Sequence, residues 1–280
     1  MGYEWVQLKD GAWSVRSVRE QETFHPVIGP EQEAETLYVR QLNLAERIGA
    51  SSEPFVLWDV GLGAAANAIV ALRHLIPVGG RIKVLSFDHT LEPMRFALRG
   101  SEHLGYLRGW EEDLGTLVRD KRLQMKRGAL EIDWKVVEGD FPTLIESGIE
   151  LEPPHAVFFD AYSPATNTAM WTLKVFSGLF QKLDPARPCS LATYSRSTLV
   201  RATLLRAGFY VGSGYATGEK EETTIAANRP ELVPALLGAD WLNRAARSTS
   251  AEPLTEPIYA QRPLSGVTKQ ILERHPQFAK

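Results

Sequence analysis

Residues 54–67, Pro-Phe-Val-Leu-Trp-Asp-Val-Gly-Leu-Gly-Ala-Ala-Ala-Asn, decide the fold class of this chain. An apolar run ends in a glycine turn, and a helix is predicted from Ala64 to Leu75. Gly61 permits a tight turn, and Gly63 permits a ligand to approach the backbone closely. The stretch therefore predicts a strand, a turn and a helix of the kind that begins a ligand-binding α/β sheet.

The same alternation of strands and helices continues along the chain. Further apolar strands are predicted at 81–88, 132–137, 155–160 and 189–194. Helical segments are predicted to fill residues 92–128, and a helix follows the last of these strands. Two more strands, 209–215 and 222–228, are close enough in sequence to pair antiparallel. Because buried strands that alternate with helices form parallel sheets, we predict an α/β fold with a mostly parallel seven-stranded sheet and an antiparallel last strand.

Weaker patterns flank this α/β unit, which we place at residues 51–235. Residues 1–50 are predicted to form an N-terminal extension that contributes to the substrate side. The extension holds a predicted strand at 13–19 and a predicted helix at 31–48. Residues 236–280 are expected to be an irregular C-terminal arm that ends in a short helix.

Composition excludes several classes of protein. With a net charge of −3 and a pI near 6.1, the chain does not resemble a general nucleic-acid binder. Its single cysteine, Cys189, excludes an intramolecular disulfide and a thiolate zinc site, and the six histidines show no metal-ligand spacing. Because of these two features, we expect no bound metal. We find no apolar stretch of membrane-spanning length and no secretory signal, so we expect a cytoplasmic protein. The sequence does not indicate an oligomeric state.

Acidic residues recur where predicted strands end, at Asp59, Asp88, Asp140 and Asp160. Ligands of open α/β sheets bind beyond these strand ends. A single aspartate there is more often a helix cap or a turn former, but four at successive strand ends indicate a shared site. Asp88 could accept both ribose hydroxyls of an adenosine cofactor, and Gly139 with Asp140 could accept its adenine amino group. Asp140 could equally be the N-cap of the following helix.

The segment Asp160-Ala-Tyr-Ser-Pro-Ala-Thr-Asn-Thr-Ala-Met-Trp171 is the most informative part of the chain. An apolar strand delivers a carboxylate, and a loop rich in hydroxyl groups, an amide and aromatic rings follows it. Ser-Pro and Asn also occur in ordinary turns. Asp160 is nevertheless well placed to meet a cationic or proton-bearing nucleophile beside the cofactor.

On these motifs the sequence resembles the methyltransferase part of the MnmC family, in the stand-alone form that lacks the flavin oxidase domain. The matching segments are Glu35-Thr-x-Tyr-Val39, Gly61-x-Gly63 with Asn67, Asp160 to Thr172, Ala192-Thr-Tyr-Ser195, Val200-Arg201, Ala207-Gly-Phe209 and Gly218-x-Lys-x-Glu222. The resemblance covers roughly residues 10 to 230. It implies a Rossmann-like class I methyltransferase fold with S-adenosylmethionine as cofactor.

The resemblance also implies roles for individual residues. The cofactor would be held by Asp59, Gly61, Gly63, Asn67, Asp88, Gly139, Asp140 and Asp160. The reaction would be N-methylation of 5-aminomethyl(-2-thio)uridine at the tRNA wobble position, with Asp160 orienting the amine and accepting its proton. The substrate would contact Tyr162, Ser163, Asn167, Trp171, Tyr194 and Lys220. Its partner would be the anticodon region of tRNA, and the enzymes that install the aminomethyl group would be indirect partners.

Three positions depart from the family pattern. The family commonly has glycine near Ala65, glutamate where Asp88 stands, and proline where Thr168 stands. Two other readings therefore stay open. One is a small-amine transferase of the polyamine aminopropyl type, and the other is a non-catalytic nucleotide-binding module.

A tRNA partner requires basic residues near the site. The run 119–127, with Arg95, Arg99 and Arg108 upstream, is more often a solvated helical face than a groove binder. Stronger candidates are nearer the predicted strand ends: Lys174, Arg196, Arg201 and Lys220. His25 could line the pocket or could be an ordinary loop residue.

Overall fold

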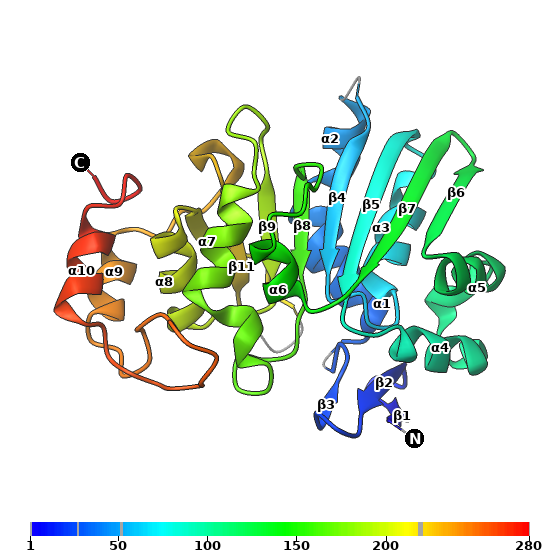
Figure 1. Cartoon of the computed structure of the whole chain (residues 1–280), viewed down its shortest axis with the longest axis horizontal. Helices are drawn as coiled ribbons and strands as arrows, with labels where there is room; N and C mark the ends of the chain where they lie inside the picture. The colour runs from blue at the N-terminus through cyan, green and yellow to red at the C-terminus, as the bar shows by residue number, and fades with distance from the viewer. Residues whose placement is uncertain (1, 27, 51–52, 218–220, 280) are drawn as a thin grey trace.

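The computed structural model describes residues 2–26, 28–50, 53–217 and 221–279 (Figure 1). Within these residues the main sheet has eight strands, in the order β10-β11-β9-β8-β4-β5-β7-β6. The strands are β4 (Phe55–Val60), β5 (Gly80–Asp88), β6 (Arg122–Arg127), β7 (Leu130–Glu138), β8 (Ala156–Phe159), β9 (Ser190–Thr193), β10 (Tyr210–Gly214) and β11 (Thr223–Ala227). The five strands from β9 to β7 pair parallel, and β11 lies antiparallel between β9 and β10. The predicted mostly parallel sheet with an antiparallel last strand is therefore confirmed.

The predicted number of seven strands is wrong, because residues 122–127 form β6 instead of continuing a helix. Lys121 ends the preceding helix with a left-handed φ of 60°, and Gly128 turns the chain with a φ of 56°. β6 then pairs antiparallel with β7, and Leu123 is buried opposite Trp134. Basic side chains on this edge strand remain in solvent, which protects the edge from further pairing.

Helices cover both faces of the sheet. They are α1 (Pro30–Ala34), a π-helix (Glu35–Arg40), α2 (Leu44–Gly49), α3 (Ala66–Leu75), α4 (Glu92–Arg99), α5 (Glu111–Asp120), α6 (Phe141–Glu146), α7 (Leu173–Gln181), α8 (Thr198–Ala207), α9 (Ala239–Ala245) and α10 (Gly266–Glu273). Short 3₁₀ turns occur at Ser101–His103, Gly105–Leu107, Thr168–Trp171 and Pro230–Leu232. Along β4, Phe55 and Leu57 face the core that α1–α5 cover, while Trp58 and Val60 face the core under α6–α8. Burial on both faces explains why the strand is apolar throughout.

The N-terminal extension forms a separate antiparallel sheet of three strands within the described residues. These are β1 (Tyr3–Gln7), β2 (Trp13–Ser17) and β3 (Glu22–Thr23), and β1 was not expected from the sequence. Figure 1 shows this small sheet beside the end of the main sheet where the parallel strands terminate. The C-terminal arm, with α9 and α10, lies at the opposite end of the molecule from β6. The domain boundaries at residues 50 and 235 stay predictions.

Within the described residues, no helix has both the length and the apolar composition that crossing a bilayer requires.

Candidate active site

A cavity of about 730 Å³ lies at the carboxyl ends of β4, β5, β7 and β8, and the N-terminal sheet forms one of its walls. Strand order reverses at β4, which is where ligands of open α/β sheets bind. The cavity brings together most of the predicted site residues: Gly61, Gly63, Asn67, Asp88, Gly139, Asp140, Asp160, Tyr162, Ser163, Asn167 and Tyr194. Its volume falls within the range of cofactor sites.

The glycine turn after β4 lines the cavity and also packs against the backbone at Asp160. Gly61 has a φ of +95°, and a Cβ there would lie 2.6 Å from the carbonyl oxygen of Asp160. Gly61 therefore lets the loops after β4 and β8 touch. Ala65 also adopts a left-handed φ of 64°. Glycine would adopt this conformation with less strain, because a Cβ is disfavoured there.

Asp88 lies at the end of β5 and is oriented by the glycine turn. Its Oδ2 accepts a hydrogen bond from the Gly63 amide at 2.9 Å, and its Oδ1 accepts one from the Thr90 amide at 3.2 Å. The hydrogen bond to Asp88 raises the pKa of His89. A carboxylate fixed in this way at the cavity wall can still accept from a ribose diol with its remaining lone pairs.

Asp140 is the N-cap of α6, as one of the two readings of the sequence predicted. Its Oδ2 accepts from the Thr143 amide at 3.0 Å and from the Thr143 hydroxyl at 2.6 Å. Asp140 and Gly139 both line the cavity as well. The capping role is therefore compatible with a ligand contact.

Asp59 was expected to hold the cofactor but does not line the cavity. Its side chain is 1% exposed inside the sheet, and its Oδ2 accepts from the Ser86 hydroxyl at 2.8 Å. Its Oδ1 has no hydrogen-bond partner among the described residues. Burial raises the pKa of Asp59 from 3.8 to about 7. Asp59 lies one residue before the end of β4, on the same face of the strand as Leu57, so its side chain points into the core that α1–α5 cover instead of beyond the strand ends.

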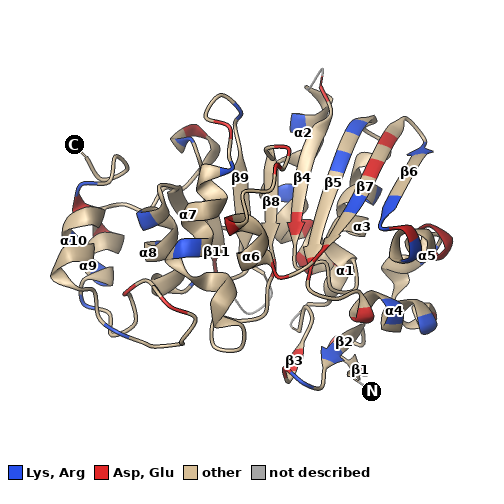
Figure 2. Ribbon diagram, in the orientation of Figure 1, with Lys and Arg blue, Asp and Glu red and all other residues tan. Residues whose placement is uncertain are grey.

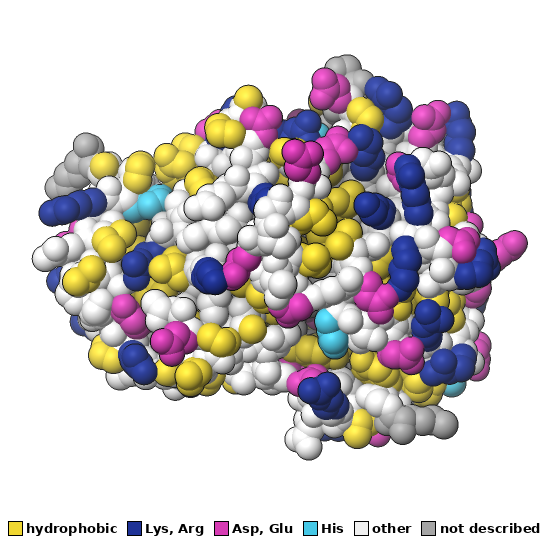
Figure 3. All heavy atoms as spheres, viewed as in Figure 1, with side chains coloured by type: hydrophobic (Ala, Val, Ile, Leu, Met, Phe, Trp, Pro, Cys, Tyr) yellow, Lys and Arg dark blue, Asp and Glu magenta, His cyan; other side chains and the backbone are white. Residues whose placement is uncertain are grey.

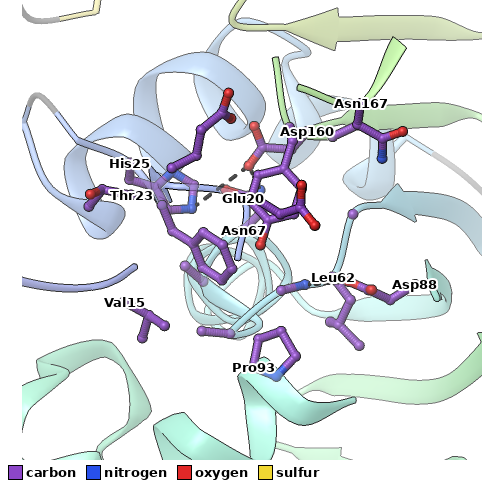
Figure 4. Close-up of a pocket in the computed structure, with 18 of the residues that line it drawn as sticks. Val15, Glu20, Thr23, His25, Leu62, Asn67, Asp88, Pro93, Asp160 and Asn167 are labelled. Atoms are coloured by element: carbon purple, nitrogen blue, oxygen red, sulfur yellow. Dashed lines mark hydrogen bonds and ion pairs between the residues drawn. The ribbon is translucent and has the colours of Figure 1, made fainter. Parts of the chain in front are cut away.

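Asp160 is the centre of a buried polar cluster (Figure 4). Its Oδ2 accepts from the Asn67 side-chain amide at 2.7 Å and lies 3.8 Å from His25 Nε2. Two buried phenols lie close by, those of Tyr38 and Tyr194. Burial, followed by the negative charge of Asp160, raises the pKa of both well above the usual range. The cluster can hold a cation and can accept its proton.

The loop after Asp160 is tied to the N-terminal sheet by Glu22. This carboxylate accepts from the Ser163 amide at 3.0 Å, from the Ser163 hydroxyl and from the Thr166 hydroxyl at 2.6 Å. Both polar groups of Ser163 are therefore engaged within the protein. Tyr162 lines the cavity beside Phe24, with ring centroids 5.7 Å apart, and burial raises its pKa.

One predicted substrate residue, Trp171, does not line the cavity, and another, Lys220, cannot be placed. Trp171 is fully buried, and its Nε1 donates to the Tyr162 carbonyl at 2.7 Å. Through this hydrogen bond, the buried ring of Trp171 supports the loop that follows Asp160 from the core. Lys220 lies outside the described residues.

The sequence missed the residues that the N-terminal extension contributes. Glu22 and Glu33 both line the cavity, and His25, which was only weighed, lines it too. Glu33 is buried in α1, inside the helix that the sequence predicted at residues 31–48. Its position in that helix was the one signal available from the sequence.

Arg201 was a candidate for phosphate contact, but it is 1% exposed. Its guanidinium donates to Thr224 Oγ1 and to the Thr223 carbonyl, and pairs with Glu222 at 3.0 Å. It stabilises the antiparallel end of the sheet. Lys174 is 70% exposed and pairs with Glu146, and Arg196 is exposed.

The basic run 119–127 is interleaved with carboxylates. Its ion pairs are Arg119–Asp120, Lys121–Glu138, Arg122–Asp133, Lys126–Glu131 and Arg127–Asp113. Figure 2 shows acidic and basic positions along β5, β7 and β6, and Figure 3 shows positive and negative side chains mixed over that part of the surface. This surface is therefore not uniformly basic.

Comparison with known proteins adds the family. Residues 109–229 match a family model described as S-adenosyl-L-methionine-dependent methyltransferase. Over this range the chain is similar to S-adenosylmethionine-dependent methyltransferases. The matched range includes the loop after Asp160, but it begins after the glycine turn at residues 61–63. The cavity suits the cofactor, because backbone at Gly61 and Gly63 and carboxylates at two further strand ends line it.

Individual relatives match most of the chain. It is 27% identical over 238 residues to the "tRNA 5-methylaminomethyl-2-thiouridine biosynthesis bifunctional protein MnmC" of Aeromonas hydrophila, an alignment that covers 76% of this chain and 34% of that protein. The chain thus spans about a third of the length of that relative. The crystal structure of MNMC2 from Aquifex aeolicus superposes with a TM-score of 0.72 at 26% identity, covering 97% of this chain and 84% of that one.

A spermidine synthase shares the fold alone. Its structure, in complex with the transition-state analogue AdoDATO, has a TM-score of 0.54 at 11% identity and covers 96% of this chain and 84% of that one. The similarity is consistent with a common Rossmann-like architecture and does not favour a particular acceptor.

Proposed function

We propose that this methyltransferase methylates the primary amine of 5-aminomethyl(-2-thio)uridine at the tRNA wobble position, giving the 5-methylaminomethyl form. The observation that carries the proposal is the placement of Asp160, a mostly buried carboxylate that ends β8 and faces the cavity. An amine is cationic at neutral pH, and a buried carboxylate attracts a cation. The printed name of the A. hydrophila relative supports a tRNA uridine as the acceptor.

S-adenosylmethionine would supply an activated methyl group. We assign its ribose hydroxyls to Asp88 and its adenine amino group to Gly139 and Asp140. Its amino-acid end would lie over Gly61 and Gly63, whose lack of side chains lets a ligand approach the backbone. Asp59 would act indirectly, since it braces β4 against β5 through Ser86.

Asp160 would prepare the amine for attack. An alkylammonium ion has no lone pair, so it must lose a proton before it can accept a methyl group. The Asn67 amide holds one carboxylate oxygen in place, which leaves Asp160 free to orient the amine and to accept its proton. Most of the rate acceleration would come from alignment of the reacting atoms.

The uridine would lie against the loop that follows Asp160. Tyr162, Asn167 and Tyr194 line this part of the cavity. Ser163 would orient the loop through Glu22, and Trp171 would support it from the core. Exposed Lys174 and Arg196, together with Lys220, are the remaining candidates for contacts with phosphates around the anticodon. A tRNA substrate also places the reaction in the cytoplasm, downstream of the enzymes that install the aminomethyl group.

The test is nucleoside analysis of tRNA by mass spectrometry. Undermodified tRNA is incubated with the protein and a donor that carries a labelled methyl group, and Asp160→Asn is the matched control. We expect label in 5-methylaminomethyl(-2-thio)uridine with the natural sequence and far less with the variant. Transfer of an aminopropyl group to a small polyamine, from a donor labelled in its propyl chain, with no methyl label in tRNA would favour the aminopropyl-type alternative. Donor binding without transfer to either acceptor would favour the nucleotide-binding module.

A further inference from the structure

His25 lies between two buried carboxylates at the wall of the cavity (Figure 4). Its Nε2 is 3.8 Å from Asp160 Oδ2, and its Nδ1 is 4.0 Å from Glu33 Oε2. His25 and Glu33 both belong to the N-terminal extension, whereas Asp160 directly follows β8, so the fold brings the extension and the main sheet together at this point. These separations are longer than hydrogen bonds, but a shift of about 1 Å would close either of them.

The backbone at His25 is held in an uncommon conformation. Its φ is 47°, in the left-handed region, and its side chain is only 9% exposed. A non-glycine residue is uncommon in this region, although histidine occurs there more often than most residues. Such conformations cluster at functional sites because the surrounding structure must impose them. Here the imposed conformation keeps the imidazole ring directed at Asp160.

The other ionisable groups around His25 are less suited to carry a proton. Burial raises the pKa of the Tyr38 and Tyr194 phenols well above the usual range, so both keep their protons. The Glu22 carboxylate is engaged with the Ser163 and Thr166 hydroxyls. Imidazole exchanges protons readily near neutral pH. Beside Asp160, His25 is therefore the group in this cluster best able to move one.

We propose that His25, backed by Glu33, receives the proton of the substrate amine from Asp160 and passes it to solvent. The inference rests on the proposed amine substrate. An ammonium N–H bond breaks, its electron pair stays on nitrogen, and the proton moves to Asp160 Oδ2 and then to His25 Nε2. The resulting imidazolium has its Nδ1–H directed at Glu33. The amine lone pair forms the new N–C bond as the methyl–sulfur bond of the donor breaks, and one proton leaves per turnover.

Proton release on amine binding tests this path without turnover. The probe is an anticodon stem-loop RNA that carries 5-aminomethyluridine, added to protein saturated with S-adenosylhomocysteine. Stopped-flow mixing with a pH indicator follows the proton that enters the solvent. We expect the natural protein to release this proton about 100-fold faster than His25→Gln, the lower end for a positioned acid–base group. Equal rates of proton release from the two proteins would overturn the relay.

The matched control for this measurement is His74→Gln. His74 lies 3.7 Å from a carboxylate, that of Glu35, but it does not line the cavity. His74→Gln should release the proton as fast as the natural protein. Glu33→Gln should release it more slowly, because His25 then accepts the proton from Asp160 without a counter-charge; an unchanged rate of release would remove Glu33 from the relay.

Chemical rescue tests the same step during turnover. His25→Ala should slow single-turnover methyl transfer by about 100-fold at neutral pH, the lower end for a positioned acid–base group. Added imidazole should restore part of the rate, whereas a packing role would not respond to imidazole. A rate that imidazole leaves unchanged, with the same loss at every pH, would refute the relay. If His25→Ala does not fold, His25→Gln and the pH dependence of its rate serve instead.

Failure of the relay and failure of the proposed function give different results. If the natural protein does not methylate the RNA at all, the proposed substrate is wrong and the relay falls with it. If the natural protein methylates the RNA but the His25 variants show full rates of methyl transfer and of proton release, only the relay is wrong.

Discussion

The side-chain amide of Asn67 donates a hydrogen bond of 2.7 Å to Asp160 Oδ2. Asn67 belongs to the first turn of α3, and Asp160 directly follows β8, so the bond joins the start of this helix to the end of that strand. Gly61 adds a contact through the backbone, since it leaves space for the Asp160 carbonyl. The proposed cofactor loop and the proposed catalytic carboxylate are therefore linked at two points.

Removal of the Asn67 amide should affect the rate more than the fold. We expect Asn67→Ala to slow methyl transfer by about 10- to 100-fold, because a hydrogen bond to a charged group contributes roughly 1.5–3 kcal/mol. Single-turnover kinetics with the tRNA substrate measures the change. A variant with the natural rate would show that Asp160 is oriented without Asn67.

The contact between Gly61 and Asp160 should matter for stability. Gly61→Ala places a methyl group 2.6 Å from a backbone oxygen and a Cβ at a φ of +95°, so we expect a loss of about 2 kcal/mol or more in the free energy of unfolding. Gly115→Ala is the matched control, because a Cβ there meets open space within α5. Urea denaturation should show that this control is stabilised by about 0.5–1 kcal/mol. Equal effects of the two changes would contradict the steric account.

Asp88 should contribute to donor binding. We expect Asp88→Ala to weaken S-adenosylmethionine binding by about 1.5–3 kcal/mol, the scale for lost hydrogen bonds to a charged group. Calorimetry measures this, with Asp133→Ala, on the exposed face of β7, as a control that keeps the natural affinity. Unchanged affinity in Asp88→Ala would remove this carboxylate from the proposed site.

The buried carboxyl of Asp59 should make stability depend on pH. Burial raises its folded-state pKa from 3.8 to about 7, so between these values the folded state binds more protons than the unfolded state. Asp59 therefore lowers the free energy of unfolding progressively as pH rises from about 4 to about 7. Asp59→Asn removes this dependence.

We expect the stability of Asp59→Asn relative to the natural protein to rise by about 2 kcal/mol between roughly pH 5.5 and pH 7. Urea denaturation at the two pH values measures it. Glu102→Gln, a change at a largely exposed carboxylate, should show no such trend. A pH-independent difference for Asp59→Asn would mean that Asp59 is already ionised in the folded state.

The sequence predicted the parts of this molecule that local patterns control. The glycine turn at Gly61 and the acidic strand end at Asp160 were recognisable because strand ends of a parallel sheet meet at one edge. The N-cap role of Asp140 followed from its position before Pro142. These features depend on residues close together in the sequence.

The missed features depend on distant pairing. β6 forms because a hairpin with β7 buries Leu123 against Trp134, which a helical propensity over 92–128 cannot reveal. Arg201 is buried because its guanidinium, on α8, donates hydrogen bonds to the Thr223 carbonyl and the Thr224 hydroxyl of β11. His25 and Glu33 reach the cavity through the fold of the N-terminal extension, whose sequence shows only weak periodicity.

The most direct test of the account is the single-turnover rate of Asp160→Asn on undermodified tRNA as a function of pH. The variant keeps the size of the side chain and loses its charge and most of its basicity. We expect near-normal affinity for the methyl donor and a methylation rate at neutral pH about 100-fold lower or more, with a smaller loss at high pH, where more of the amine is already neutral. A variant that methylates tRNA at the natural rate at neutral pH would contradict the account, because Asp160 would then be only a structural turn residue.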